Sequence, residues 1–150
     1  MNEPDHTLHK KGTQSPDVTS LLIDIEKMML QLSKMCADTL FVFTADHGFI
    51  DVDPLCLEDY PELMNMLQVP PSLEPRAMNL FIKPEYLEKF CSLFHKITKN
   101  TYHLYSKQEV LKNALFGPPP VHPLLEEMLG DYLAVAQTPL TLFPNRSYLD

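Results

Sequence analysis

The chain of 150 residues has the length of one domain, and its composition is globular, with 45% hydrophobic residues, 4 glycines and 14 prolines. Its net charge of −8 argues against a broad nucleic-acid surface, which requires a basic face. Three cysteines without a Cys-x-x-Cys pair argue against a disulfide framework and favour a reducing compartment, so we expect a cytoplasmic protein. No apolar run is long enough to span a bilayer.

The first part of the chain predicts a loop, a helix and a buried strand. Residues 1–12 are polar without apolar periodicity, which predicts a loop. Ser15, Pro16 and Asp17 then form a helix start, and apolar residues follow at helical spacing as far as Met35. Residues 39–44 (Thr-Leu-Phe-Val-Phe-Thr) predict a strand buried on both faces, which is typical of a parallel sheet.

The remaining chain shows short alternating elements separated by prolines. We expect extended chain at 49–52 that is broken at 53–54, then a helix over 55–67 with a kink or a new start at 61, and a stiff linker over 70–75. After the linker we expect a strand over 77–82, a helix over 84–98, a strand over 101–105 and a helix over 107–116. The last elements are a helix over 123–129, a strand over 132–136 and a tail over 138–150 without a strong pattern.

Two pairs of residues have side chains suited to metal binding. Asp46 and His47 follow the predicted strand, at the end where open α/β sheets bind their ligands. Asp5 and His9 are four residues apart, a spacing that brings both side chains round one ion in a helix or turn. From spacing alone, solvated loop residues remain the simpler interpretation of Asp5, His6 and His9.

A resemblance to a known family changes that balance. Residues 3–12 (Glu-Pro-Asp-His-Thr-Leu-His-Lys-Lys-Gly), followed by a helix, a strand and residues 44–48 (Thr-Ala-Asp-His-Gly), resemble the alkaline phosphatase superfamily, and within it the type I phosphodiesterase/nucleotide pyrophosphatase-like group. Residues 115–117, 122–123 and 130–134 are also similar to members of that group. The resemblance implies an α/β fold, as part of an alkaline-phosphatase-like α/β/α sandwich with a small inserted α/β subdomain.

The resemblance implies a hydrolase of phosphoric esters with two divalent metal ions, zinc first and manganese as the alternative. Asp5 and His9 match two ligands of one metal, and Asp46 and His47 match two ligands of the other. In this family a Thr or Ser nucleophile attacks the substrate, a small phosphate ester, and His6 is a candidate substrate contact.

The chain also departs from the family pattern. The nucleophile and a further Asp ligand belong to an amino-terminal part without a counterpart here, and a third histidine would follow the end of the chain. Thr13, Ser15 and Thr44 are poor substitutes for the nucleophile. We therefore expect a carboxy-terminal fragment that binds metal weakly and has no turnover by itself.

Two alternatives stay open, a phosphoglycerate mutase and a non-catalytic protein of the same fold, whereas the contexts of Cys36, Cys56 and Cys91 disfavour a sulfatase. A cofactor-independent phosphoglycerate mutase shares both metal motifs, but it has Asn where this chain has Phe49; a sulfatase would need a Cys-x-Pro-x-Arg motif. A non-catalytic remnant or interaction module of the same fold would explain the missing nucleophile.

The resemblance and the prolines together suggest three parts. Residues 1–69 form the ligand-bearing part of the core, residues 70–120 an inserted α/β subdomain, and residues 121–150 a return to the core. The oligomeric state has no signal in the sequence.

Overall fold

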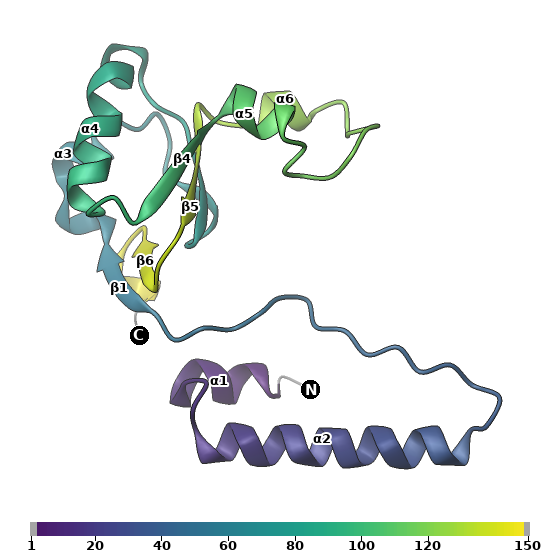
Figure 1. Cartoon of the computed structure of the whole chain (residues 1–150). Coiled ribbons are helices and arrows are strands. Elements are labelled where there is room, and N and C mark those ends of the chain that lie inside the picture. Colours follow the sequence, from purple (N-terminus) through teal and green to yellow (C-terminus); the bar gives the residue numbers. More distant parts are fainter. Residues whose placement is uncertain (1–2, 149–150) are drawn as a thin grey trace. The chain divides into compact units, whose positions relative to one another are not determined.

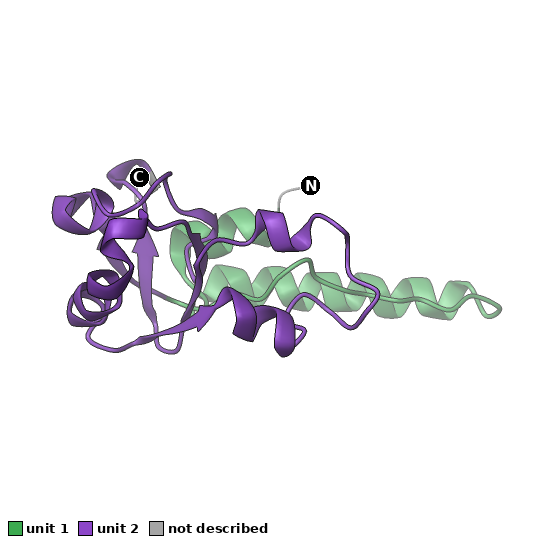
Figure 2. Ribbon diagram, turned by 90° about the horizontal axis from the view of Figure 1, so that it is seen from above, with its two compact units in different colours: residues 1–51 green, residues 52–150 purple. Residues whose placement is uncertain are grey.

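The structure is a computed structural model that describes residues 3–148 and separates into two compact units, residues 1–51 and 52–150 (Figure 2). Helices occur together with both parallel and antiparallel strand pairs, so the expected α/β class is confirmed. The complete sandwich and the three-part division at 69/70 and 120/121 stay predictions.

Unit 1 contains two helices, α1 (Asp5–Lys11) and α2 (Pro16–Met35) (Figure 1). The predicted start of α2 is confirmed, because the Asp17 backbone N–H donates to Ser15 Oγ at 3.3 Å. The predicted loop over residues 1–12 is wrong where α1 forms. This helix buries no residue, so it leaves no apolar periodicity in the sequence, although its charges suit a helix, with Asp5 in the first turn and Lys11 in the last.

The predicted strand over residues 39–44 is also wrong. After α2 the chain turns back and runs in extended form along the helix, and no strand pairing involves it among the residues that the structure describes (Figure 1). Leu40 is 87% exposed and Val42 77% exposed. A strand of this apolar character needs hydrogen-bonding neighbours and covered faces, and the described part of unit 1 supplies neither.

Unit 2 is built on two sheets. A four-stranded antiparallel sheet has the order β2-β3-β5-β4, and a separate parallel pair joins β1 to β6. The strands are β1 (Asp53–Cys56), β2 (Ser72–Glu74), β3 (Ala77–Leu80), β4 (Tyr102–Ser106), β5 (Tyr132–Ala136) and β6 (Leu140–Phe143). The helices are α3 (Pro61–Met64), α4 (Leu87–Ile97), α5 (Lys107–Lys112) and α6 (Leu125–Met128), with 3-10 turns at Leu57–Asp59, Pro84–Tyr86 and Arg146–Tyr148.

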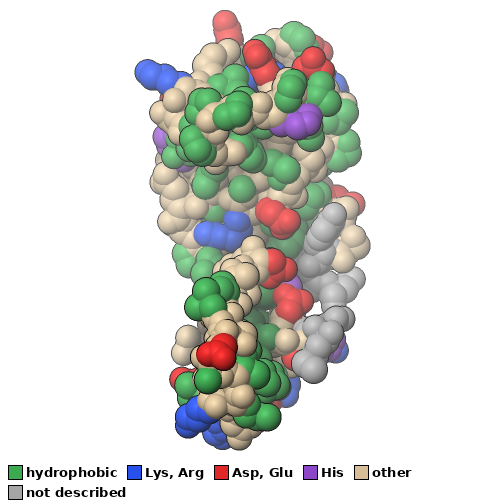
Figure 3. All heavy atoms as spheres, turned by 90° about the vertical axis from the view of Figure 1, so that its right-hand side faces the viewer, with side chains coloured by type: hydrophobic (Ala, Val, Ile, Leu, Met, Phe, Trp, Pro, Cys, Tyr) green, Lys and Arg blue, Asp and Glu red, His purple; other side chains and the backbone are tan. Residues whose placement is uncertain are grey.

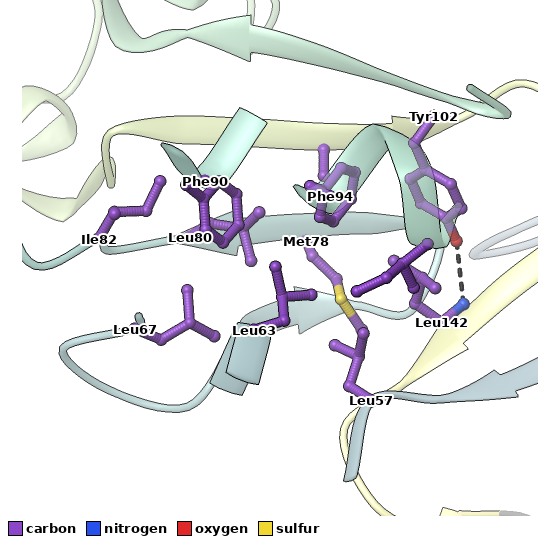
Figure 4. Packing of buried hydrophobic residues seen from close by; sticks show 12 residues of the cluster. Leu57, Leu63, Leu67, Met78, Leu80, Ile82, Phe90, Phe94, Tyr102 and Leu142 are labelled. Carbon is purple, nitrogen blue, oxygen red and sulfur yellow. Dashed lines mark hydrogen bonds between the residues drawn. The ribbon is translucent and has the colours of Figure 1, made fainter. Parts of the chain in front are cut away.

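The strand alternation of β5 divides the core of unit 2 into two clusters. Ala134 lies in the larger cluster, where Phe90 and Phe94 of α4 pack on Met78 and Leu80 of β3 (Figure 4). The neighbouring Leu133 points to the opposite face of the sheet and belongs to a smaller cluster, which it forms with Val110 and Leu129. Each face of the four-stranded sheet thus has its own apolar cover.

Gly130 shows how closely this sheet is packed at the entry to β5. A Cβ built at this position would lie 2.3 Å from the Leu80 carbonyl oxygen, so no larger residue fits without a shift of the backbone. The buried Asn79 side chain accepts from the Gly130 backbone N–H at 2.7 Å and donates to the Met128 carbonyl at 3.0 Å. The turn before β5 is therefore fixed by both space and hydrogen bonding.

Most elements after residue 76 follow the predictions, whereas residues 49–75 and the tail do not. The strands at 77–82, 101–105 and 132–136 and the helix at 84–98 are confirmed with small shifts of their bounds. The helix over 55–67 is reduced to α3, which begins at Pro61, and the supposed break at 53–54 is the start of β1. The linker contains β2, which pairs with the adjacent β3 across the turn at residues 75–76. The tail contains β6, which forms by pairing with the distant β1.

Candidate functional site

Helix α1 places Asp5 and His9 on one face. Residues four apart are neighbours on a helix surface, and His9 Nε2 lies 3.6 Å from Asp5 Oδ1. Both side chains are more than half exposed to solvent. His6, one position after Asp5, is exposed and points away from this face by the helical period, so its role as a substrate contact stays a prediction.

The loop that contains Asp46 and His47 brings a second imidazole to Asp5. His47 Nε2 lies 4.0 Å from Asp5 Oδ1 and 3.9 Å from Asp46 Oδ1. The backbone N–H of His47 donates to Asp46 Oδ1 at 3.1 Å, and His47 Nδ1 lies 3.1 Å from the Gly48 carbonyl oxygen. In the tautomer with the proton on Nδ1, His47 would donate to that carbonyl and present Nε2 to the carboxylates, which is the form that a metal-binding imidazole requires.

An aromatic ring and a carboxylate connect the two segments. The Phe49 ring lies 4.6 Å from the His9 ring in an edge-to-face arrangement and 5.5 Å from the His47 ring. Asp51 accepts two hydrogen bonds from Thr13, and these bonds hold the pKa of the Asp51 carboxyl below its ordinary value. Phe49 and Asp51 were not identified as site residues from the sequence, because an aromatic or acidic residue after a Gly carries no specific signal.

Imidazole nitrogens and carboxylate oxygens are the donors that zinc accepts. Tetrahedral ligands of one zinc ion lie about 3.3 Å apart at ordinary bond lengths. Asp5 and His9 lie 3.6 Å apart and Asp46 and His47 3.9 Å apart, so each pair is somewhat wider than that spacing. No group of three or more His, Cys, Asp or Glu side chains within residues 3–148 meets the requirements of a metal site. The donor types suit a divalent cation, but the described residues do not form a complete metal site.

The hydroxyls considered as nucleophiles have other partners. Thr13 Oγ1 donates to Asp51, Ser15 Oγ caps α2, and Thr44 Oγ1 donates to the adjacent Ala45 carbonyl at 3.3 Å. His122 Nδ1 accepts from the Leu124 backbone N–H at 3.2 Å. Neither the Ser15 nor the Thr44 contact gives a hydroxyl a general base, because the partners of both are backbone groups.

The described part of unit 2 carries an open apolar cavity of about 440 Å³. The cavity is lined by Leu73, Glu74, Ala77, Tyr105, Leu115, Phe116, Leu133 and Val135. Figure 3 shows many hydrophobic side chains on one face of unit 2. Exposed apolar residues in and between α5 and α6 include Phe116, Val121 and Met128. This region offers apolar surface without the convergent polar groups of a catalytic pocket.

No helix within residues 3–148 combines the length and the apolar character needed to cross a bilayer. The candidate site thus consists of Asp5, His9, Asp46 and His47, all in unit 1, with Phe49 and Asp51 beside them.

The comparisons with known proteins support the fold. No protein-family model matches the chain, and no curated protein matches its sequence. The structure is similar to murine ectonucleotide pyrophosphatase/phosphodiesterase 5, with a TM-score of 0.64, 18% sequence identity and 97% of this chain covered. It is also similar to an inactive form of that protein in complex with AMP, with a TM-score of 0.66 at the same identity. In both comparisons the chain spans 38% of the neighbour's length, so its fold is similar to part of a nucleotide pyrophosphatase/phosphodiesterase.

Proposed function

We propose that the chain is a part of a metal-dependent hydrolase of phosphoric esters. The observation that carries the proposal is the approach of two imidazoles to one carboxylate: His9 and His47 lie within 3.6 and 4.0 Å of Asp5 Oδ1, although they are 38 residues apart. The likeness of the fold to a nucleotide pyrophosphatase/phosphodiesterase supports the same interpretation.

In this proposal Asp5 and His9 bind one divalent ion, and Asp46 and His47 bind a second, with zinc as the first choice and manganese as the alternative. Such ions, when bound, polarise a phosphoryl oxygen and activate water. The substrate is a small phosphate ester of the nucleotide type, in keeping with the AMP bound to the structural neighbour. The nucleophile is a Thr or Ser of polypeptide outside this chain, so the isolated chain binds metal weakly and does not turn over.

An interaction module of the same fold is the second candidate, and the exposed apolar segment at 39–44 favours it. Leu40, Val42 and Phe43 are more than half exposed, as expected if this surface is completed by other polypeptide. The same surface is also what an enzyme fragment would present. Turnover therefore decides between the two candidates.

The test is a chromogenic phosphodiester assay of the protein extended by its flanking polypeptide, in zinc and in manganese. Asp46→Ala should lower kcat/KM at least about a hundredfold, because the remaining donor of the pair cannot hold its ion. Asp38→Ala, which removes an exposed carboxylate of the same unit, should leave kcat/KM unchanged. Equal activity of both variants and the unaltered protein would refute the site, and an inactive extended protein would favour the interaction module.

A further inference from the structure

Asp51 forms a two-point contact with the connection between α1 and α2. The Thr13 backbone N–H donates to Asp51 Oδ1 at 2.8 Å, and the Thr13 hydroxyl donates to Asp51 Oδ2 at 2.7 Å. Both carboxylate oxygens are thereby engaged by one residue that lies 38 positions earlier in the chain. A carboxylate held through both oxygens has a defined orientation, unlike one that makes a single surface hydrogen bond.

The backbone next to Thr13 is shaped for this close approach. Gly12 ends α1 with a φ of +76°, a conformation that other residues rarely adopt. A Cβ at this position would also lie 3.0 Å from Asp51 Oδ1. A side chain at residue 12 would strain the backbone and crowd the carboxylate that Thr13 binds.

This contact joins the two segments that carry the candidate metal ligands. Thr13 lies just after α1, which presents Asp5 and His9, and Asp51 lies four residues after His47. The Phe49 ring, between the His9 and His47 rings, makes a second connection between the same segments. With few buried side chains in unit 1, these contacts carry much of the connection between α1 and the loop of Asp46 and His47.

The geometry points to Asp51 and Thr13 as a positioning pair that sets the distance between the two halves of the metal site. This inference rests on the proposed function, because it assumes that Asp5, His9, Asp46 and His47 are metal ligands. Groups that hold metal ligands in place typically change metal affinity by 10- to 100-fold when they are removed. Asp51 therefore acts on the metal through the placement of His47 and its neighbours, without itself being a ligand.

The test measures Zn²⁺ and Co²⁺ binding to the 150-residue chain by calorimetry and by the visible spectrum of bound Co²⁺. Asp51→Asn should weaken binding about tenfold or more and change the Co²⁺ spectrum, because the amide retains one acceptor and loses the other. Thr13→Val, which leaves the net charge unchanged, should weaken binding in the same direction, and Thr13→Ser should restore it. Asp38→Asn, which removes the same charge from an exposed position, should bind as the unaltered chain does.

A second readout needs no metal. The nuclear Overhauser contact between the His9 and Phe49 rings should be present in the unaltered chain and lost in Asp51→Asn, whereas the helical circular dichroism of α2 stays the same. This measurement separates a displaced segment from an unfolded chain. Loss of the ring contact together with weaker metal binding supports the positioning role.

The outcomes distinguish this inference from the proposed function. If Asp5→Ala abolishes metal binding while Asp51→Asn matches Asp38→Asn, the positioning pair is refuted and the metal site stands. If Thr13→Ser binds as weakly as Thr13→Val, the hydroxyl has no part and the positioning pair is refuted as well. If the unaltered chain binds neither ion, or Asp5→Ala binds normally, the proposed metal site and its positioning pair are both refuted.

Discussion

The two units of this protein differ in how they are held together. Unit 2 packs two apolar clusters on the faces of an antiparallel sheet, whereas Val18 is the one described residue of unit 1 in the buried apolar set. Unit 1 nevertheless carries the candidate metal ligands, and unit 2 carries none of them. The candidate metal ligands therefore lie on the unit with the smaller apolar core, where a few hydrogen bonds and ring contacts connect the segments.

The greatest loss of stability is expected from a substitution in the core of unit 2, compared with one on the apolar surface of unit 1. Phe94→Ala should lower the free energy of unfolding by about 3–5 kcal/mol, because it leaves a cavity beneath α4. Leu40→Ala, at an 87% exposed position, should change it by less than about 0.5 kcal/mol. Urea unfolding followed by circular dichroism measures both. A large effect of Leu40→Ala would mean that the segment at 39–44 is packed in solution.

An intermediate effect is expected at a buried hydroxyl of unit 2. Tyr102 donates to the Pro75 carbonyl and accepts from the Leu142 backbone N–H, both at 3.0 Å, so it ties β4 to β6 and to the turn before β3 (Figure 4). Tyr102→Phe leaves both backbone groups without this partner and should destabilise unit 2 by about 1–3 kcal/mol.

Amide hydrogen exchange provides the specific readout for that variant. The Leu142 amide should exchange faster in Tyr102→Phe than in the unaltered chain, while the amides of β5 keep their relative order of protection. Unchanged protection of Leu142 together with unchanged stability would show that this hydroxyl has no role in holding β6.

The least change in stability is expected from acidification. In both units a carboxylate has a lowered pKa because it accepts hydrogen bonds. Glu109 accepts from the Ser106 hydroxyl at 2.7 Å and from its backbone N–H at 2.8 Å in a capping box at the start of α5, and these bonds lower the pKa of Glu109. A group whose pKa is lower in the folded chain than in the unfolded chain stabilises the fold at a pH above its unfolded pKa, which is about 4.3 for Glu. That stabilisation is lost as the pH falls through the pKa of the folded chain. Unit 2 should therefore lose stability on acidification below about pH 4.3.

The capping contribution is isolated by comparing Glu109→Gln with Ser106→Ala. Glu109→Gln should remove this part of the acid dependence, and Ser106→Ala should reduce it in part, because the bond from the Ser106 backbone N–H remains. The double variant should reduce it no further than Glu109→Gln alone. Additive effects of the two substitutions would contradict the assignment to this capping box. In unit 1 the stability should depend on pH in the same direction at Asp51, because its hydrogen bonds with Thr13 lower the pKa of its carboxyl.

The prediction of the fold from sequence was most accurate where a pattern is local. The cap at Ser15, the apolar face of α4 and the strand at 132–136 follow directly from neighbouring residues. The strand β6 was not predicted, because it forms through pairing with β1, far away in the chain. The strand β2 was not predicted, because its three residues lie between prolines and are too few to show an alternation, although its partner β3 is adjacent. Helix α1 was not predicted because it has no buried face.

The sequence alone determined which side chains are available for chemistry: two Asp–His pairs, an acidic composition and no obvious nucleophile. Tertiary structure alone decided that Asp5 faces both His9 and His47, that Phe49 lies between their rings, and that Asp51 binds Thr13. The physical reason is that helical spacing fixes neighbours within about one turn. A contact across 38 residues depends on how the chain folds back, which residue spacing does not specify.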